Sequence, residues 1–352
     1  MQVLDTVPWE KLTPVTDWLF DRISHSIIIG SRLRLARNFQ GLPFPHQATA
    51  EESWKLLHQV ARVLTENSQD EFIILEIEGL SEIDRAVLVE QHLISLEFAQ
   101  ENYPRAVVVF PDLRISMMVN EEDHIRLQGF SPGLSLKSLW KKIDRLDNLL
   151  DQHLKIAFHP VLGYLTACPS NLGSGFRASV LIHLPGLVLT RKHHLLFSAL
   201  KDIGIVIRGW YGEGTPPAGH FFQVSSGENL GKTEAEVIHQ MEIVVKLVVE
   251  EERKIRQEMA ESYRWRKRLR ETVEKFKVAG QLSTETALSF LSWLVLGAEW
   301  KMIGLNGKRF GQIIRKILPG HLQQEYGSRL SPAQRDRLRA KLLQKELREI
   351  YV

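Results

Sequence analysis

The chain has 352 residues, 44% of them hydrophobic, which is enough for two domains with an ordinary core. Its 45 basic and 42 acidic residues leave a formal charge of only +3, which argues against nucleic acid as a partner. The one cysteine, Cys168, excludes an internal disulfide framework and a cysteine-based zinc site, and it fits a reducing compartment.

The N-terminal segment does not have the pattern of a targeting sequence. Its first 25 residues contain acids, two prolines and no uninterrupted apolar core, so no signal peptide is expected. No stretch approaches the roughly 18 apolar residues that a membrane helix needs. We therefore expect a soluble, cytoplasmic protein without a membrane partner.

Strand and helix signals alternate as far as about residue 255. Runs of Val, Ile and Phe bounded by Gly, Pro, Asn and Asp predict strands within 26–36, 71–79, 106–120, 177–190, 204–212 and 221–227. Helical periodicity predicts helices over 51–66, 81–100, 135–151, 185–203 and 233–252. Thr233 and Glu236 form a capping box that begins the last of these helices.

After residue 255 only helical signals follow, over 264–278, 283–297, 308–317 and 332–350. Basic runs such as ERKIRQEM and RWRKRLRE are interpreted as solvated helix faces rather than nucleic-acid contacts. The prediction is an α+β domain over residues 1–255, followed by an all-α domain over residues 256–352.

The segment SRLRLAR, residues 31–37, places two arginines side by side. Strand alternation puts Arg32 and Arg34 on one face of the strand, with leucines on the other. Neighbouring guanidinium groups repel each other, so this face suits an anion such as a polyphosphate. Taken alone, the segment fits a solvated strand face equally well.

The segment NEEDHIR, residues 120–126, follows the apolar strand 115–119. Its acids, His124 and Arg126 could bind a metal, or a carboxylate such as Glu122 could hold a guanidinium in bidentate fashion. A surface turn is the alternative, which the segment alone favours.

The segment CPSNLGSGFR, residues 168–177, contains glycines that allow a backbone to approach a ligand closely, and Arg177 adds a partner for phosphate. The Cys168 thiol is expected to be partly exposed with a lowered pKa, although a buried cysteine is the commoner case. No GK[ST] follows, so this is not a Walker A loop.

The segment RGWYGEG, residues 208–214, has Arg208 at a strand end and Glu213 in a loop flanked by glycines. The alternative is that this loop only connects two strands and has no functional role. Together the four segments supply five arginines and two carboxylates, which is the inventory needed to hold a nucleotide triphosphate beside a guanidinium group.

These four segments, in this order, closely resemble the signature segments of the phosphagen kinases, the creatine and arginine kinases, over roughly residues 25–250. The resemblance implies a mostly antiparallel sheet flanked by helices, with ATP and Mg²⁺ as cofactors and no protein ligand to the metal. It also implies catalytic carboxylates at Glu122 and Glu213 and a reactive cysteine, Cys168, in contact with the substrate guanidinium. The matching phosphate-binding residues are Arg32, Arg34, Arg126, Arg177 and Arg208. Leu181 stands where the family commonly has a histidine near the adenine, so that contact is expected to be apolar or shifted.

The layout of the chain resembles the bacterial protein arginine kinases (the McsB family). No helical domain fits before the arginine strand, and about 100 residues follow the matching region. In addition, RDRLRA, residues 335–340, resembles the RDxxRA motif with which that family's helical domain recognises phosphoarginine. The resemblance implies phosphoarginine binding by Arg335, Asp336 and Arg339.

The physical pattern of this last segment is a helix that begins at Ser331 and Pro332, an N-cap followed by proline at the first position. Arg335 and Arg339 are then i,i+4 neighbours on one face, a mildly destabilising pair that a phosphorylated ligand would relieve. The apolar face is expected to consist of Leu338, Leu342 and Leu343. An ordinary solvated face is the alternative.

The function that the resemblance implies is ATP-dependent phosphorylation of arginine side chains in proteins, which marks them for Clp-type proteolysis. The implied partners are protein substrates with exposed arginines, an activator protein, a Clp ATPase or protease, and a second copy of the chain. One rival is a kinase of free arginine or another small guanidino compound, against which the missing N-terminal domain speaks. The other is a catalytically inactive phosphoarginine-binding adaptor, against which the retained carboxylates, cysteine and arginines speak.

Overall fold

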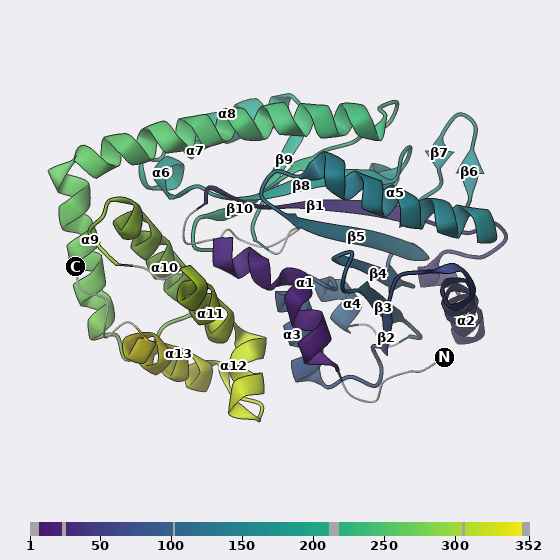
Figure 1. Ribbon diagram of the computed structural model, residues 1–352, viewed down its shortest axis with the longest axis horizontal. Coiled ribbons are helices and arrows are strands. Elements are labelled where there is room, and N and C mark those ends of the chain that lie inside the picture. Colours follow the sequence, from purple (N-terminus) through teal and green to yellow (C-terminus); the bar gives the residue numbers. More distant parts are fainter. Residues whose placement is uncertain (1–6, 23–25, 101–102, 211–217, 305–306, 347–352) are drawn as a thin grey trace. The chain divides into compact units, whose positions relative to one another are not determined.

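The computed structural model describes residues 7–22, 26–100, 103–210, 218–304 and 307–346 (Figure 1). They fall into two compact units, each assembled from separate parts of the chain. The first unit comprises Met1–Thr16, Ser31–Ser179 and Ser225–Glu242, and the second comprises Asp17–Gly30, Val180–Val224 and Ile243–Val352.

Eight strands form one sheet, in the order β2-β3-β4-β5-β1-β8-β10-β9. The pairs β2–β3, β3–β4 and β4–β5 are antiparallel, with Ile73 opposite Val109 and Met117 opposite Leu127. The predicted α+β fold with a mostly antiparallel sheet is therefore confirmed. The strands are β1 (Ile28–Arg37), β2 (Ile73–Glu76), β3 (Ala106–Phe110), β4 (Ile115–Val119), β5 (Ile125–Pro132), β8 (Phe176–His183), β9 (Ile205–Arg208) and β10 (Phe221–Ser226).

The first unit contains the helices α2 (Ala50–Asn67), α3 (Glu82–Glu90), α4 (Leu96–Gln100) and α5 (Leu136–His153). Helix α5 lies along β5 (Figure 1). Its leucine and isoleucine side chains recur at helical spacing and are buried. Gly129 in β5 permits this packing, because a Cβ there would lie 2.9 Å from the Cδ1 atoms of Leu139 and Ile143. A short hairpin, β6 (Phe158–His159) and β7 (Gly163–Tyr164), follows α5.

The second unit contains α6 (Pro185–Leu189), α7 (His193–Asp202) and the C-terminal helices. Helix α8 (Glu234–Glu261) begins in the first unit, which includes residues as far as Glu242, and continues into the second. It begins at the predicted capping box, where the Glu236 carboxylate accepts from Thr233 N at 2.8 Å. It continues through residue 255, so the predicted domain boundary falls within a helix. The remaining helices are α9 (Tyr263–Lys277), α10 (Thr284–Glu299), α11 (Gly307–Ile317), α12 (Pro319–Tyr326) and α13 (Pro332–Glu346).

A buried charge network ties α6, α8 and α10 together within this second unit. Arg256 donates to Glu252 at 2.6 Å, to Glu299 at 2.8 Å and to the carbonyl oxygen of His183 at 2.7 Å. Glu252 also accepts from the backbone N–H groups of Gly186 and Leu187, each at 2.8 Å. These bonds satisfy the orphan donors at the start of α6.

Two predicted helices are interrupted, and several elements among the described residues were not predicted. The stretch 81–100 divides into α3 and α4, and 185–203 divides into α6 and α7. The breaks coincide with left-handed residues, His92 at φ 58° and Arg191 at φ 62°, which end a right-handed helix. The unpredicted elements include β5, α1 (Trp9–Arg22), the β6–β7 hairpin and α12. None of the described helices is long and apolar enough to cross a membrane.

Candidate active site

The turn between β4 and β5 separates two adjacent glutamates. Asn120 adopts φ 62° and donates from Nδ2 to the carbonyl oxygens of Ser53 and Pro104 at 3.0 and 2.8 Å. Glu121 is then buried, whereas Glu122 is exposed. The turn thus gives two chemically identical side chains different environments.

Glu121 is the counter-charge of Arg126. Its two oxygens accept from Arg126 Nη1 at 2.6 and 2.8 Å, and Ser95 Oγ donates to Oε1 at 2.7 Å. Burial alone would raise the pKa of Glu121, but Arg126 outweighs burial and holds this pKa at about 2. Burial alone would lower the pKa of Arg126, and the Glu121 carboxylate raises it instead.

Glu122 presents an exposed carboxylate to which the Cys168 thiol is hydrogen-bonded. Partial burial, followed by the negative charges of Asp123 and Glu121, raises the pKa of Glu122 above its ordinary value. The half-buried Cys168 places its Sγ 3.1 Å from Ser170 Oγ. The structure therefore brings together the two predicted groups, one from the β4–β5 turn and one from the glycine-rich segment.

Asp123 and Asn38 hold these two segments against each other. Asp123 Oδ1 accepts from Asn38 Nδ2 at 2.6 Å and from Ala167 N at 2.7 Å. Asn38 in turn accepts from the backbone N–H of His124 at 2.9 Å. Because Ala167 adjoins Cys168, this buried network positions the thiol beside Glu122.

His124 is committed to backbone partners. Its Nδ1 accepts from Phe39 N at 3.0 Å, which leaves Nε2 to donate to the carbonyl oxygen of Pro43 at 2.8 Å. Burial is the main cause that lowers the pKa of His124. Both ring nitrogens of this neutral imidazole are occupied, so it acts as a structural residue of the turn. The described residues contain no group of three or more His, Cys, Asp or Glu side chains that could hold a metal ion.

Arg32, Arg126 and Arg177 form a cluster of positive charge, here called the arginine cluster. Burial, followed by repulsion from Arg126 and with a smaller part from Arg177, lowers the pKa of Arg32 to about 9 despite the Glu121 carboxylate. Arg32 Nη2 donates to Gln128 Oε1. Its Nε is buried and has no hydrogen-bond partner among the described residues. Two neighbouring guanidinium groups therefore repel that of Arg32, an arrangement that an anion would stabilise.

Arg37, the third arginine of strand β1, has a structural role. It donates from Nε and Nη2 to Asp147 at 3.0 and 2.7 Å, and from Nη1 to the carbonyl oxygen of Ser174 at 2.9 Å. The backbone at Gly175 passes so close that a Cβ would lie 2.6 Å from the Ala36 carbonyl oxygen. Gly175 also has φ 62°, which a side chain would strain. Arg37 and Gly175 thus fix the glycine-rich segment against β1.

The remaining predicted residues lie in both units. Arg34 is buried in the first unit and donates to Ser179 Oγ at 3.4 Å. Arg208 ends β9 in the second unit and is half-buried, and Leu181 is buried in β8. Glu213 lies outside the described residues.

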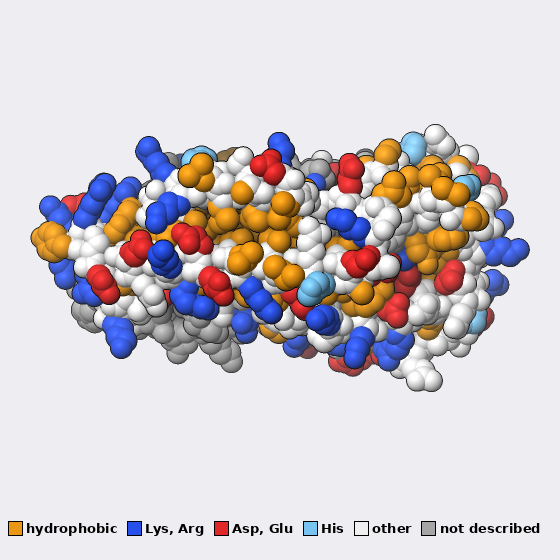
Figure 2. Space-filling view, turned by 90° about the horizontal axis from the view of Figure 1, so that it is seen from above, with side chains coloured by type: hydrophobic (Ala, Val, Ile, Leu, Met, Phe, Trp, Pro, Cys, Tyr) orange, Lys and Arg blue, Asp and Glu red, His pale blue; other side chains and the backbone are white. Residues whose placement is uncertain are grey.

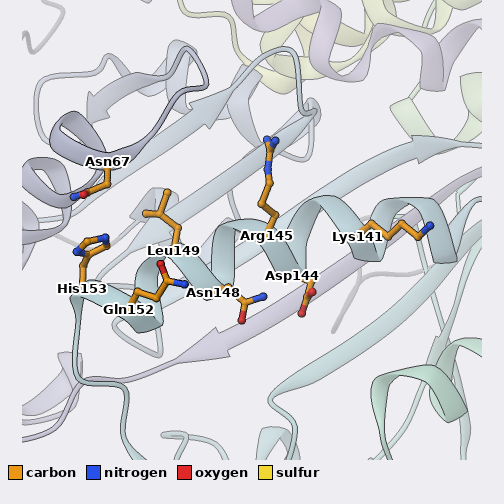
Figure 3. A pocket seen from close by; sticks show the side chains of 8 residues that line it. All are labelled: Asn67, Lys141, Asp144, Arg145, Asn148, Leu149, Gln152 and His153. Atoms are coloured by element: carbon orange, nitrogen blue, oxygen red, sulfur yellow. The ribbon is translucent and has the colours of Figure 1, made fainter.

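A pocket of about 520 Å³ beside α5 contains none of the predicted site residues (Figure 3). Its lining is polar, and Arg145 there is bonded to Asp70 at 2.6 Å. The arginine cluster and Glu122 therefore remain the candidate site. The pocket is lined by Asn67, Lys141, Asp144, Arg145, Asn148, Leu149, Gln152 and His153.

Comparison with known proteins agrees with this geometry. Residues 55–255 match the C-terminal catalytic domain of the ATP:guanido phosphotransferases, and residues 268–351 match the C-terminal domain of the protein-arginine kinase McsB. The protein-arginine kinase of Moorella thermoacetica is 39% identical over 91% of this chain and 94% of its own. The chain belongs to the protein-arginine kinase family of ATP:guanido phosphotransferases.

A solved relative supports the same fold for the kinase. The duplicated taurocyamine kinase from Schistosoma mansoni with bound transition state analog components has a TM-score of 0.59 and 28% identity. The match covers 69% of this chain and 35% of that chain, so this kinase spans about a third of the duplicated enzyme. ATP is the phosphoryl donor of the family, and the lowered pKa and unpartnered Nε of Arg32 fit a bound polyphosphate.

The two arginines of the C-terminal motif have different environments in the kinase. Arg339 is 1% exposed and donates to the carbonyl oxygens of Ile317 and Leu282 at 2.8 and 2.7 Å, and to Asp336 at 2.6 Å. Arg335 is half-buried. The alternative of an ordinary solvated face therefore does not hold for Arg339, because backbone carbonyl groups from outside α13 accept its hydrogen bonds within the bundle.

Sequence reasoning missed the residues that hold the catalytic groups in place. The roles of Glu121, Asn38, Asp123, Gln128 and Arg37 depend on partners far away in the chain. Strand alternation gives no local signal for Glu121 and Glu122, because both lie in the turn between β4 and β5.

Proposed function

We propose that the kinase transfers the γ-phosphoryl group of ATP to arginine side chains of proteins. The observation that carries the proposal is an exposed carboxylate, Glu122, bonded to the Cys168 thiol and electrostatically coupled to Arg126 of the arginine cluster. Phosphoryl transfer depends mainly on positioning and on neutralising charge, and this arrangement supplies both.

The arginine cluster holds the phosphates of ATP, and Arg34 and Arg208 join this role through their match to the family's segments. ATP supplies the phosphoryl group, and Mg²⁺ accompanies it, held mainly by phosphate oxygens and water. Arg126 keeps its position because Glu121 anchors it from the buried side. The cluster neutralises charge on the phosphoryl group as the bond to ADP breaks.

Glu122 acts on the substrate guanidinium. A guanidinium group is protonated at neutral pH, so one nitrogen must lose its proton to become nucleophilic. Glu122 aligns the guanidinium and accepts that proton as the P–N bond forms. Its raised pKa makes it a stronger base than an ordinary carboxylate. Cys168 contacts the same guanidinium, and Glu213 is the second aligning carboxylate.

The protein substrate follows from family membership and from the C-terminal helices. Residues 1–255 form the proposed catalytic domain, and residues 256–352 form the proposed phosphoarginine-binding domain. In the second, Arg335 supplies the accessible charge, while Arg339 orients Asp336 toward the ligand's guanidinium end. A cytoplasmic location, an activator protein, a Clp ATPase or protease that receives the product, and pairing of two chains complete the proposal.

Incubation with γ-labelled ATP and either casein or free arginine tests this function. We expect acid-labile label on casein, and little or none on free arginine at the same arginine concentration. Transfer to free arginine alone would support the small-molecule rival, and transfer to neither would support the inactive adaptor.

A further inference from the structure

The β6–β7 hairpin in the first unit exposes a run of apolar side chains. Residues 158–162 are all exposed, and Phe158, Val161 and Leu162 are among them. Residues 158–164 contain no Asp, Glu, Lys or Arg. Figure 1 shows the hairpin projecting beyond α5, and Figure 2 shows hydrophobic side chains gathered at that end of the molecule. Clustered exposed apolar side chains commonly mark an interaction site.

Hydrogen bonds and a cation–π contact hold the hairpin in place at its base and at its tip. At its base, Tyr164 N donates to the carbonyl oxygen of Gly173 at 2.7 Å, and the Arg37 guanidinium carbon lies 3.5 Å from the centroid of the Tyr164 ring. At its tip, His159 Nδ1 accepts from the backbone N–H groups of Val161 and Leu162, each at 3.2 Å. The backbone N–H groups at the tip therefore find a hydrogen-bond acceptor within the hairpin, while its apolar side chains are exposed to solvent.

The base of the hairpin packs directly on the glycine-rich segment. A Cβ on Gly163 would lie 2.4 Å from the Gly173 carbonyl oxygen. Leu230 approaches Gly173 from another part of the chain, with a Cβ on Gly173 falling 3.4 Å from its Cδ1, and Leu230 is exposed as well. Phe158, Val161, Leu162 and Leu230 are here called the apolar rim.

We propose that the apolar rim binds the polypeptide on either side of the target arginine, through apolar side chains a few residues from it. This inference rests on the proposed function and extends it to substrate recognition. Glu122 and Cys168 hold the guanidinium, and Tyr164 precedes Cys168 by four positions, a span of at most about 15 Å. An extended substrate covers that distance in about five residues. The base of the hairpin therefore lies beside the site, and the rim begins within reach of a substrate's flanking residues.

The chemistry of the rim selects this occupant over others. With no charged side chain in the hairpin, it offers nothing to the phosphates of a nucleic acid and repels neither acidic nor basic peptides. A free arginine would fill the guanidinium site without reaching the tip. A polypeptide with leucine-like side chains beside the arginine would bury both sets of apolar atoms.

The test compares Val161→Gln and Phe158→Gln with a matched control, Val278→Gln. Val161 and Val278 are 81% and 83% exposed, and Val278 follows α9 in the other unit. Each variant is assayed with casein, with arginine peptides flanked by either leucines or serines, and with N-acetyl-arginine methylamide. KM and kcat are determined separately for every substrate.

We expect the two hairpin variants to raise KM for casein and for the leucine-flanked peptide roughly three- to tenfold, with kcat unchanged. Values for the serine-flanked peptide and for the methylamide should stay at wild-type levels, as should every value for Val278→Gln. Unchanged KM for casein and the leucine-flanked peptide in both hairpin variants would overturn the inference. Equal loss on all substrates would also overturn it, because it would indicate a structural role, as would an equal effect of Val278→Gln. A wild type that phosphorylates no protein refutes the proposed function instead.

Discussion

Replacing Glu121 with glutamine removes the counter-charge of Arg126 while nearly preserving the shape of the side chain. The wild-type carboxylate accepts two bonds from Arg126 and one from Ser95, and its side chain is 6% exposed. Glutamine can replace one acceptor but not the negative charge. The variant therefore removes the anion in contact with Arg126 and leaves the repulsion within the arginine cluster less compensated, because only the more weakly coupled Glu122 and Asp123 remain as negative neighbours of Arg126.

The size of the effect follows from the pKa of Glu121. A fall from an ordinary value of 4.5 to about 2 corresponds to about 3 kcal/mol of stability at neutral pH. Because the folded-state pKa is the lower one, this contribution is fully present above the ordinary value and is lost as the pH falls toward about 2. Wild type and variant should accordingly differ most near pH 7 and converge in acid.

Urea unfolding at several pH values between 3 and 7 measures this difference, with Glu66→Gln, an exposed glutamate of the same unit, as the control. We expect Glu121→Gln to lose about 3 kcal/mol at pH 7 and clearly less at pH 3, with no change for the control. A loss below about 1 kcal/mol at pH 7, or the same loss at both pH values, would refute the reasoning that Glu121 neutralises the arginine cluster.

Four further variants probe the catalytic and C-terminal groups. Glu122→Gln should lower kcat by orders of magnitude with little change in the Kd for ATP, and the raised pKa of Glu122 should place the acid limb of wild-type kcat/KM above pH 4.5, as steady-state kinetics would show. Cys168→Ser should cost less activity than Glu122→Gln, and alkylation of wild type should inactivate it; harmless alkylation would exclude a role for the thiol. Arg339→Met should destabilise the protein by about 3 to 5 kcal/mol, since it leaves buried partners unpaired. Arg335→Ala should keep the wild-type Tm but lose phosphoarginine binding by calorimetry; equal binding would remove Arg335 from the site.

Regular elements were predictable from the sequence because their signals are local. Apolar spacing predicted 51–66 as a helix, and α2 spans Ala50–Asn67. The capping box at Thr233 begins α8, and Ser331 and Pro332 begin α13. The breaks at His92 and Arg191 were not predictable, because neither residue type favours a left-handed backbone enough to show it in advance.

The sequence predicted the catalytic and binding groups of the candidate site, but not the residues that hold these groups in position. The pairing of Glu122 with Cys168 was expected only through resemblance, and the structure brings the two together. Which of the adjacent glutamates becomes buried depends on Ser95 and Arg126. Arg339 likewise becomes buried because carbonyl groups 22 and 57 residues away accept its protons. Long-range partners of this kind leave no periodic signal in the sequence.

The central claim is that Glu122 and the arginine cluster transfer phosphate to arginine in proteins. Mass spectrometry of casein incubated with ATP, under conditions that preserve acid-labile P–N bonds, tests it most directly when wild type and Glu122→Gln are compared. We predict phosphate on arginine guanidinium nitrogens with the wild type and almost none with the variant. Phosphate on Ser, Thr or Tyr instead, or equal phosphoarginine from both proteins, would contradict the claim.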